Sequence, residues 1–288
     1  MNSGQSSKLA WNTSLAAAWN GLAPCMISEE VWNLTQWKTA ITQNEAGSIR
    51  LRGYDLTELM GSLSFSQAIF LALKGELPSP AEAKLLDAIL VSMIDAGIAP
   101  PSAVAARVVY SGGNSFNSSV AAGLLASGDW HGGAIEACAR LFQEALADGT
   151  QNLDETARNL VARQRQAGKR LPGYGHKLHK DRDPRAKRLI DLAEELGFGK
   201  DALQLAVAVE RELREQTGRS LPLNVDGCTA ALITDLGFDW RLGKAFFLIA
   251  RTPGLCAHVM EESIREKPFR RLAPGEHIYD GPDARNLP

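Results

Sequence analysis

Cysteine is scarce in this sequence of 288 residues, which contains four, at positions 25, 138, 228 and 256. No two of them form a Cys-x-x-Cys pair, so their spacing indicates neither a disulfide framework nor a zinc site held by thiolates. Isolated thiols are typical of proteins in a reducing compartment. We therefore expect a cytoplasmic protein whose cysteines are reduced.

Strong net charge, long apolar runs and metal-binding motifs are also missing. The formal net charge is −2, which gives no electrostatic reason to expect nucleic acid or an anionic membrane as a partner. No segment approaches the roughly 18 apolar residues of a membrane span, and the N-terminus has no secretory signal. The five histidines lack zinc-site spacing, and glycine-rich nucleotide-binding patterns are absent. We expect a small-molecule substrate or a protein partner, no metal and no tightly bound cofactor.

Helical periodicity dominates the rest of the chain. Residues 1–30 lack a clear period and are expected to form an N-terminal arm, whereas alternation between Thr39 and Leu51 predicts a small hairpin turning at residues 44–47. Beyond it, apolar residues recur at helical spacing, which predicts an all-α fold. The expected helices cover residues 56–60, 65–73, 80–93, 102–110, 116–126, 134–147, 153–167, 184–196, 201–217, 228–236 and 241–262.

Capping residues define several of these helices. Ser64 is expected to cap one helix, and Ser79 with Glu82 forms a capping box for the next, which Gly97 would close. The helix over 116–126 is rich in small residues, and we interpret it as a central, tightly packed helix rather than a ligand site.

The stretch from Leu171 to Arg185 combines a loop, a histidine and a helix start. Gly175 lets the backbone turn so that His176 can project, while Asp183 followed by Pro184 is a typical N-cap and first helical residue. Arg185 then lies in the first turn, so His176 and Arg185 could face one anionic ligand. The alternative is a surface turn whose charges are solvated.

Three further residues are candidates for chemistry. His131 precedes two glycines at a helix start, where the helix dipole would depress its pKa, and a neutral histidine there can donate to an oxyanion or simply cap the helix. Asp226 is expected in a half-buried loop, where desolvation would make it basic enough to abstract a proton, or it is an ordinary N-cap. Arg251 interrupts an apolar helix, so it needs either a bound carboxylate or an internal glutamate as partner.

Four ordered motifs resemble the citrate synthase superfamily over about residues 37–282. Arg52-Gly-Tyr and Gly75-Glu-Leu-Pro are similar to its N-terminal landmarks. The motifs are His131-Gly-Gly-Ala, Gly173-Tyr-Gly-His with Asp183-Pro-Arg, Asn224-Val-Asp, and Ala250-Arg-Thr-Pro-Gly.

The resemblance implies a homodimer in which each chain has a large helical domain (31–152 and 241–288) and a small one (153–240). It implies that His131 stabilises the enolate of a coenzyme A thioester, that Asp226 removes the proton, and that His176 polarises a 2-keto acid. The carboxylate-binding arginines would be Arg185, Arg251 and, from the other subunit, Arg270 or Arg271.

Two differences from the usual family pattern determine which reaction we expect. The length and the run from Gly97 to Ser102 resemble citryl-CoA lyase and the C-terminal portion of ATP-citrate lyase, and Ala96 follows Asp95 where the family often has a histidine. We expect reversible cleavage of citryl-CoA to acetyl-CoA and oxaloacetate. The alternatives are a citrate synthase that also hydrolyses the thioester, a relative using another 2-keto acid, and a non-catalytic homologue that binds CoA esters or dicarboxylates.

Overall fold

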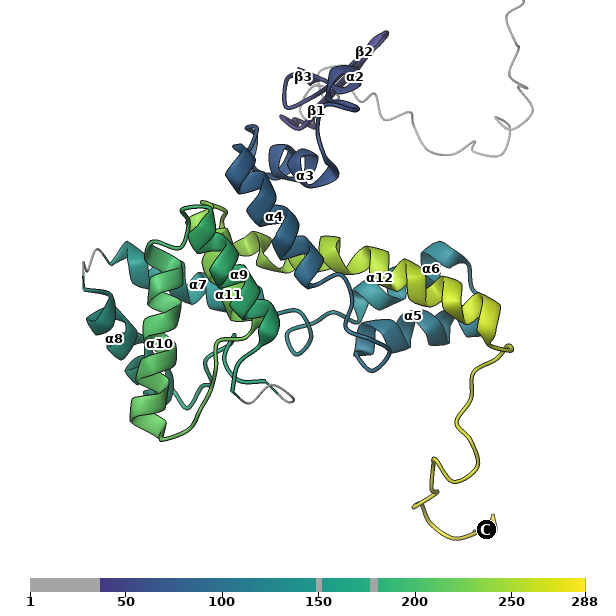
Figure 1. Cartoon of the computed structure of the whole chain (residues 1–288). Coiled ribbons are helices and arrows are strands. Elements are labelled where there is room, and N and C mark those ends of the chain that lie inside the picture. The colour runs from purple at the N-terminus through teal and green to yellow at the C-terminus, as the bar shows by residue number, and fades with distance from the viewer. Residues whose placement is uncertain (1–36, 149–151, 177–180, 288) are drawn as a thin grey trace, which may run out of the picture.

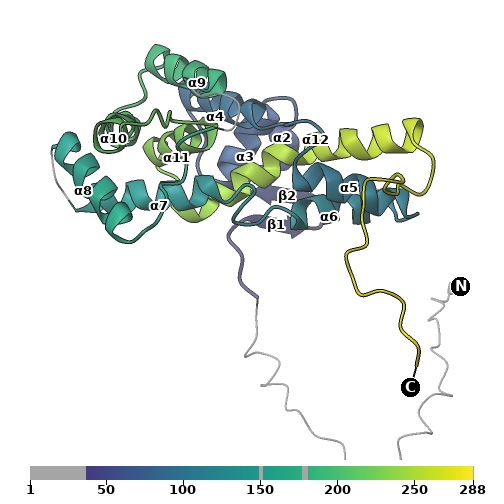
Figure 2. The same cartoon turned by 90° about the horizontal axis from the view of Figure 1, so that it is seen from below.

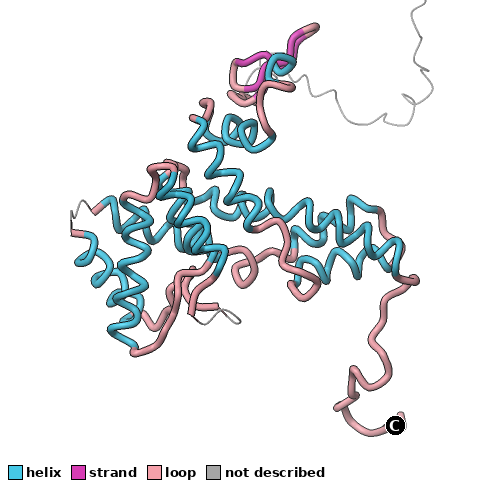
Figure 3. The backbone as a smooth tube through the Cα atoms, viewed as in Figure 1, coloured by secondary structure: helices cyan, strands magenta, loops and turns pink. Residues whose placement is uncertain are grey.

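Helices account for nearly all regular structure (Figure 3). The computed structural model describes residues 37–148, 152–176 and 181–287, so the expected N-terminal arm lies outside the described residues. The helices are α2 (Leu56–Leu59), α3 (Phe65–Lys74), α4 (Pro80–Ser92), α5 (Pro101–Ser111), α6 (Phe116–Leu125), α7 (Ala134–Ala147), α8 (Leu153–Gln166), α9 (Pro184–Glu195), α10 (Asp201–Thr217), α11 (Val225–Asp235), a 3-10 turn η3 (Trp240–Leu242) and α12 (Gly243–Arg265).

The expected hairpin is present and carries a third strand. Strands β1 (Thr42–Glu45), β2 (Ser48–Leu51) and β3 (Tyr54–Asp55) pair antiparallel in that order. The sheet lies with α2 beyond α3, away from helices α7 to α12 (Figure 1). Arg52 ties it to α3 through hydrogen bonds from Nε and Nη2 to the Ala72 carbonyl, at 3.1 and 2.8 Å.

Capping chemistry fixes several helix ends as the sequence predicts. Ser64 and Ser79 both form capping boxes, and Gly218 ends α10 in the left-handed conformation. The expectation that Gly97 closes α4 is wrong, because α4 ends at Ser92 and Gly97 lies further on in the loop with φ +75°.

Two hydrophobic clusters divide the interior. The main one joins side chains of α3, α4, α7, α8, α9, α10, α11 and the first half of α12, while a smaller one joins Ala106, Leu255 and Val259 between α5, α6 and the second half of α12. Figure 2 shows α5, α6 and the second half of α12 together on one side of the molecule. Because the main cluster draws on residues from both sides of position 152, the division into two domains stays a prediction.

None of the helices in the described ranges is long and apolar enough to cross a membrane.

Helix α6 is peripheral in the single chain, so the expectation of a central helix is wrong. Only Ser119 and Gly123 are buried on it. The expected close packing does occur at Gly123, where an added Cβ would lie 2.9 Å from the Ser102 carbonyl oxygen and 3.1 Å from Ala106 Cβ. Small side chains therefore serve the contact with α5 and leave the opposite face of α6 exposed.

Candidate active site

The loop segment from Gly173 to Gly175, just before His176, is bound to the segment that leads into α11. Asn224 N–H donates to the Gly173 carbonyl at 3.0 Å, and Asn224 Nδ2 donates to the Gly175 carbonyl at 2.8 Å. The Gly175 N–H in turn donates to the Pro222 carbonyl at 2.8 Å. These three hydrogen bonds bring two regions about 50 residues apart in sequence into one backbone unit.

Two glycines allow this contact. A Cβ on Gly227 would lie 2.4 Å from the Gly173 carbonyl oxygen, and a Cβ on Gly173 would lie 2.6 Å from the Gly227 Cα. Gly173 also has φ +83°, which side-chain-bearing residues rarely adopt. The approach of Gly173 to the first turn of α11 thus depends on the absence of side chains at both positions.

Asp183 joins the start of α9 to the start of α11. Its side chain is fully buried and, as predicted, caps α9 by accepting from the Arg185 backbone N–H at 3.0 Å. It also accepts from Arg185 Nε and Nη2, at 3.1 and 2.9 Å, and from the Val225 backbone N–H at 3.0 Å. Burial raises the pKa of Asp183, but the hydrogen bonds from Arg185, its positive charge and the Val225 N–H together outweigh burial and hold the pKa below its usual value. The Arg185 guanidinium is therefore held in place, with its side chain 34% exposed.

Asp226 is the second residue of α11 and not part of a loop. The helix begins at Val225, three residues earlier than expected, and its N-cap is Asn224, so the interpretation of Asp226 as the N-cap is wrong. Burial raises the pKa of Asp226, the positive charge of Arg185 lowers it, the negative charge of Asp183 raises it, and Arg251 lowers it again. The net pKa lies above that of a free aspartate, which makes the carboxylate a stronger base.

His131 lies two residues before the α7 N-cap, Gly133, and packs against α5 and α12. Its Nε2 is 2.8 Å from Ser102 Oγ, and its ring meets the edge of Phe247 at a centroid distance of 5.3 Å. The pKa of His131 is lowered as expected, but by burial and then by the charge of Arg251. The imidazole is therefore neutral at physiological pH.

Arg251 projects from the middle of α12 into the same region. Its side chain is 5% exposed and lies over the Phe247 ring, 5.1 Å from the centroid. Neither Nε nor Nη1 has a hydrogen-bond partner among the described residues. The expected alternative of a glutamate partner is wrong, because the carboxylate beside it belongs to Asp95, 3.9 Å from Nη1.

Four of the predicted site residues therefore act on one another. The charge of Arg251 affects the pKa values of His131 and Asp226, and Arg185 affects those of Asp226 and Arg251. His176 follows Gly175, whose carbonyl accepts the hydrogen bond from the Asn224 side chain at the start of α11. Among the described residues, no group of three or more His, Cys, Asp or Glu side chains could hold a metal ion.

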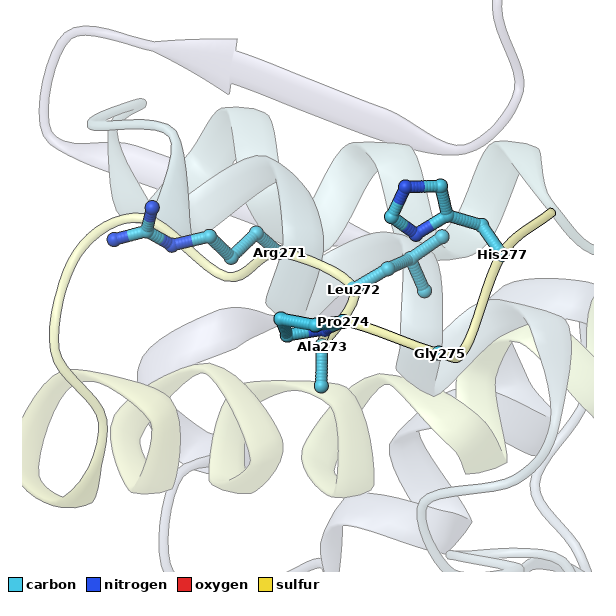
Figure 4. Close-up of a pocket in the computed structure, with 6 residues that line it drawn as sticks. All are labelled: Arg271, Leu272, Ala273, Pro274, Gly275 and His277. Carbon is cyan, nitrogen blue, oxygen red and sulfur yellow. The ribbon is translucent and has the colours of Figure 1, made fainter. Parts of the chain in front are cut away.

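Arg270 and Arg271 lie elsewhere, in the chain that follows α12. Arg270 donates from Nε and Nη2 to Glu262, at 3.0 and 2.7 Å, whereas Arg271 is exposed with its guanidinium over the Phe269 ring. Arg271 also stands at one side of a hollow formed by this tail segment (Figure 4). The hollow is lined by Arg271, Leu272, Ala273, Pro274, Gly275 and His277, and none of these contributes to the cluster around Asp226.

Sequence reasoning missed several residues that shape the site. Ser102 and Phe247 contact His131, and no local pattern marks either of them. His258 contacts Asp95, and its position seven residues after Arg251 could have indicated that both share one helix face.

Comparison with known proteins identifies relatives for most of the chain. A family model described as citrate synthase, C-terminal domain, matches residues 72–272. "Putative citrate synthase 2" of Mycobacterium tuberculosis is 32% identical over 215 residues, which cover 73% of this chain and 54% of that protein. The citrate synthase of Heyndrickxia coagulans is 32% identical over 231 residues, which cover 78% of this chain and 58% of that protein. The chain thus spans about half the length of these curated relatives.

Two solved structures are similar over longer stretches. The citryl-CoA lyase from Hydrogenobacter thermophilus is 50% identical and has a TM-score of 0.83, with 88% of this chain and 97% of that chain covered. The ATP citrate lyase from Methanothrix soehngenii, in complex with citrate and coenzyme A, is 25% identical with a TM-score of 0.73, covering 98% of this chain and 46% of that one.

Proposed function

The chain belongs to the citrate synthase family, and on this premise we propose that it cleaves citryl-CoA reversibly to acetyl-CoA and oxaloacetate. The similarity to a citryl-CoA lyase over nearly the whole length of both chains supports this reaction over others of the family. Coenzyme A enters as part of the substrate, and no tightly bound cofactor has a role.

Asp226 is the base in the condensing direction, and His131 stabilises the enolate. A thioester methyl group is a very weak carbon acid, so the carboxylate needs a hydrogen-bond donor at the developing oxyanion. If the Ser102 hydroxyl donates to His131 Nε2, the proton of the neutral imidazole is on Nδ1 and available to the thioester oxygen. In the cleavage direction Asp226 returns the proton to the enolate.

His176 polarises the keto group, and Arg185 and Arg251 hold the carboxylates of oxaloacetate. The observation that carries the proposal is the state of Arg251, a guanidinium with a 5% exposed side chain and two unpartnered donor nitrogens near the raised-pKa carboxylate of Asp226. Burying such a charge is costly unless a ligand carboxylate supplies the hydrogen bonds. A dicarboxylate substrate supplies them.

A third arginine comes from the second subunit of a homodimer, and we assign this role to Arg271. Glu262 is buried and already binds both Arg107 and Arg270, so Arg270 anchors the tail to α12. Arg271 makes no ion pair in its own chain, as far as the described residues extend, and is free to reach a neighbour. A cytoplasmic location remains a prediction from the cysteine content.

The experiment that separates this proposal from the synthase alternative supplies acetyl-CoA and oxaloacetate and follows free thiol. A lyase forms citryl-CoA without releasing coenzyme A, whereas a synthase releases it. Binding of citrate and coenzyme A without any turnover in either direction would favour the non-catalytic alternative.

A further inference from the structure

Asp95 lies between Arg251 and His258, which share one face of α12 because they are two helical turns apart. The loop after α4 is seated tightly on this face. A Cβ on Gly254 would lie 2.3 Å from the Ile94 carbonyl oxygen and 3.2 Å from Asp95 Cβ. The backbone that carries Asp95 is thus fixed against the helix that carries both of its neighbours.

Partners other than Arg251 occupy the Asp95 carboxylate. His258 Nε2 is 3.0 Å from Oδ1, and the Gly97 N–H donates to Oδ2 at 2.8 Å. Arg251 Nη1 is 3.9 Å from Oδ1, which is too far for a hydrogen bond. An arginine and a carboxylate at such a short separation normally form a short, often bidentate, ion pair. Here the carboxylate stays apart, and Arg251 keeps Nε and Nη1 unpartnered.

We propose that His258 is a positioning residue that holds Asp95 back from Arg251 and so reserves the Arg251 donors for a carboxylate of the substrate. The inference rests on the proposed function, in which Arg251 binds a dicarboxylate. Asp95 still acts through space on Arg251: burial lowers the pKa of the guanidinium, and the charge of Asp95 opposes that effect. Asp95 therefore stabilises the cation without occupying its hydrogen-bond donors.

The His258 Nε2 atom must carry the proton in this arrangement, because an ionised carboxylate only accepts hydrogen bonds. Burial raises the pKa of Asp95, but hydrogen bonds from the Gly97 and Ala96 backbone and from His258 outweigh it and keep the carboxyl ionised. Without His258, a mobile and charged Asp95 would compete with the substrate for Arg251.

A double-mutant cycle on the full chain tests this role, with oxaloacetate binding measured by titration calorimetry and turnover measured with citryl-CoA. His258→Phe removes the donor and keeps a planar ring, and it should weaken oxaloacetate binding by about tenfold or more, with a smaller change in kcat. His258→Gln restores a donor near the Nε2 position and should bind like the wild type.

The decisive comparison repeats His258→Phe in an Asp95→Asn background, where the amide carries no charge to compete for Arg251. There the histidine substitution should change the affinity by less than about threefold, because only a charged Asp95 needs restraint. An equal loss of affinity in both backgrounds, or none in either, overturns the inference. If His258→Phe fails to fold, His258→Leu takes its place in the same cycle. Wild-type protein that binds neither oxaloacetate nor citrate overturns the proposed function instead.

Discussion

Asp226 shows how one carboxyl group acquires its chemistry from its surroundings. Its place in the first turn of α11 exposes it to the opposing charges of Arg185, Arg251 and Asp183, and burial decides the outcome by raising its pKa. The motif containing Asp226 was recognisable in the sequence. Its helical position and the cause of its basicity depend on side chains that come from α9 and α12.

Replacement of Asp226 by Asn tests its role as the base. The amide has the same shape but cannot accept the proton, so kcat should fall by roughly 10²–10⁴-fold. Binding of oxaloacetate should change little, because the arginines remain. Asp191→Asn, at an exposed carboxyl on α9, is the matched control and should leave kcat unchanged. Full activity of Asp226→Asn would remove this residue from the mechanism.

The same substitution should stabilise the fold at neutral pH. A carboxyl whose folded-state pKa is raised costs stability above that pKa, and the cost disappears as the pH falls toward the unfolded value near 3.8. Asp226→Asn should therefore have a higher thermal midpoint than the wild type at pH 7, with a gap that narrows as the pH is lowered. Thermal unfolding across a pH series measures the gap, and a constant or negative gap contradicts the raised pKa.

Helix ends that depend on one local residue were predictable, and those that depend on tertiary packing were not. The Ser79 capping box and the Gly218 end of α10 follow from the sequence alone. Helix α11 begins at Val225, three residues before the start that the sequence indicates, since Gly227 is a poor helix former. The close approach of Gly173 explains why that glycine is nevertheless inside the helix.

Pairs of residues far apart in sequence had no local signal. Ser102 and His131 are separated by 29 residues, and Asp95 and His258 by 163. Which side chain meets which depends on how α5 and the loop after α4 pack against α12. The motifs therefore indicated the chemistry of the site, while the residues that orient it required the structure.

The contact between the His176 loop and α11 can be tested at Gly227. Gly227→Ala forces the two backbones apart, and it should lower the free energy of unfolding by about 1–3 kcal/mol and reduce turnover as well. Gly128→Ala is the matched control, since a Cβ there meets no atom within 4 Å. Chemical denaturation gives the stability of each variant. Equal stability of the two variants would show that the loop accommodates the methyl group.

At the scale of the whole molecule, the proposal requires two chains for each complete site. Arg271→Ala should lose substrate affinity without losing stability, whereas Arg270→Ala should lose stability, because it leaves the buried Glu262 with one partner fewer. Kinetics and thermal unfolding on both variants separate the two roles. Loss of substrate affinity in Arg270→Ala alone would reverse the assignment.

Subunit complementation tests the shared site directly. Asp226→Asn and Arg271→Ala chains should each be nearly inactive alone. A co-expressed heterodimer regains one complete site, because the intact Asp226 of one chain meets the intact Arg271 of the other. Mixed dimers should therefore have about half the wild-type activity per dimer, because one of the two active sites in each mixed dimer is complete. No recovery would place Arg271 in the site of its own chain, and full activity of Arg271→Ala alone would remove Arg271 from the mechanism.

The central claim is that this chain cleaves the carbon–carbon bond of citryl-CoA, and the most direct measurement supplies citryl-CoA to the purified protein. Oxaloacetate formation, followed through its reduction by NADH and malate dehydrogenase, and acetyl-CoA formation, followed by chromatography, should occur in equal amounts. Free coenzyme A should not appear, and the Asp226→Asn variant should form both products roughly 10²–10⁴-fold more slowly. Release of citrate and free coenzyme A, or no reaction at all, would contradict the account.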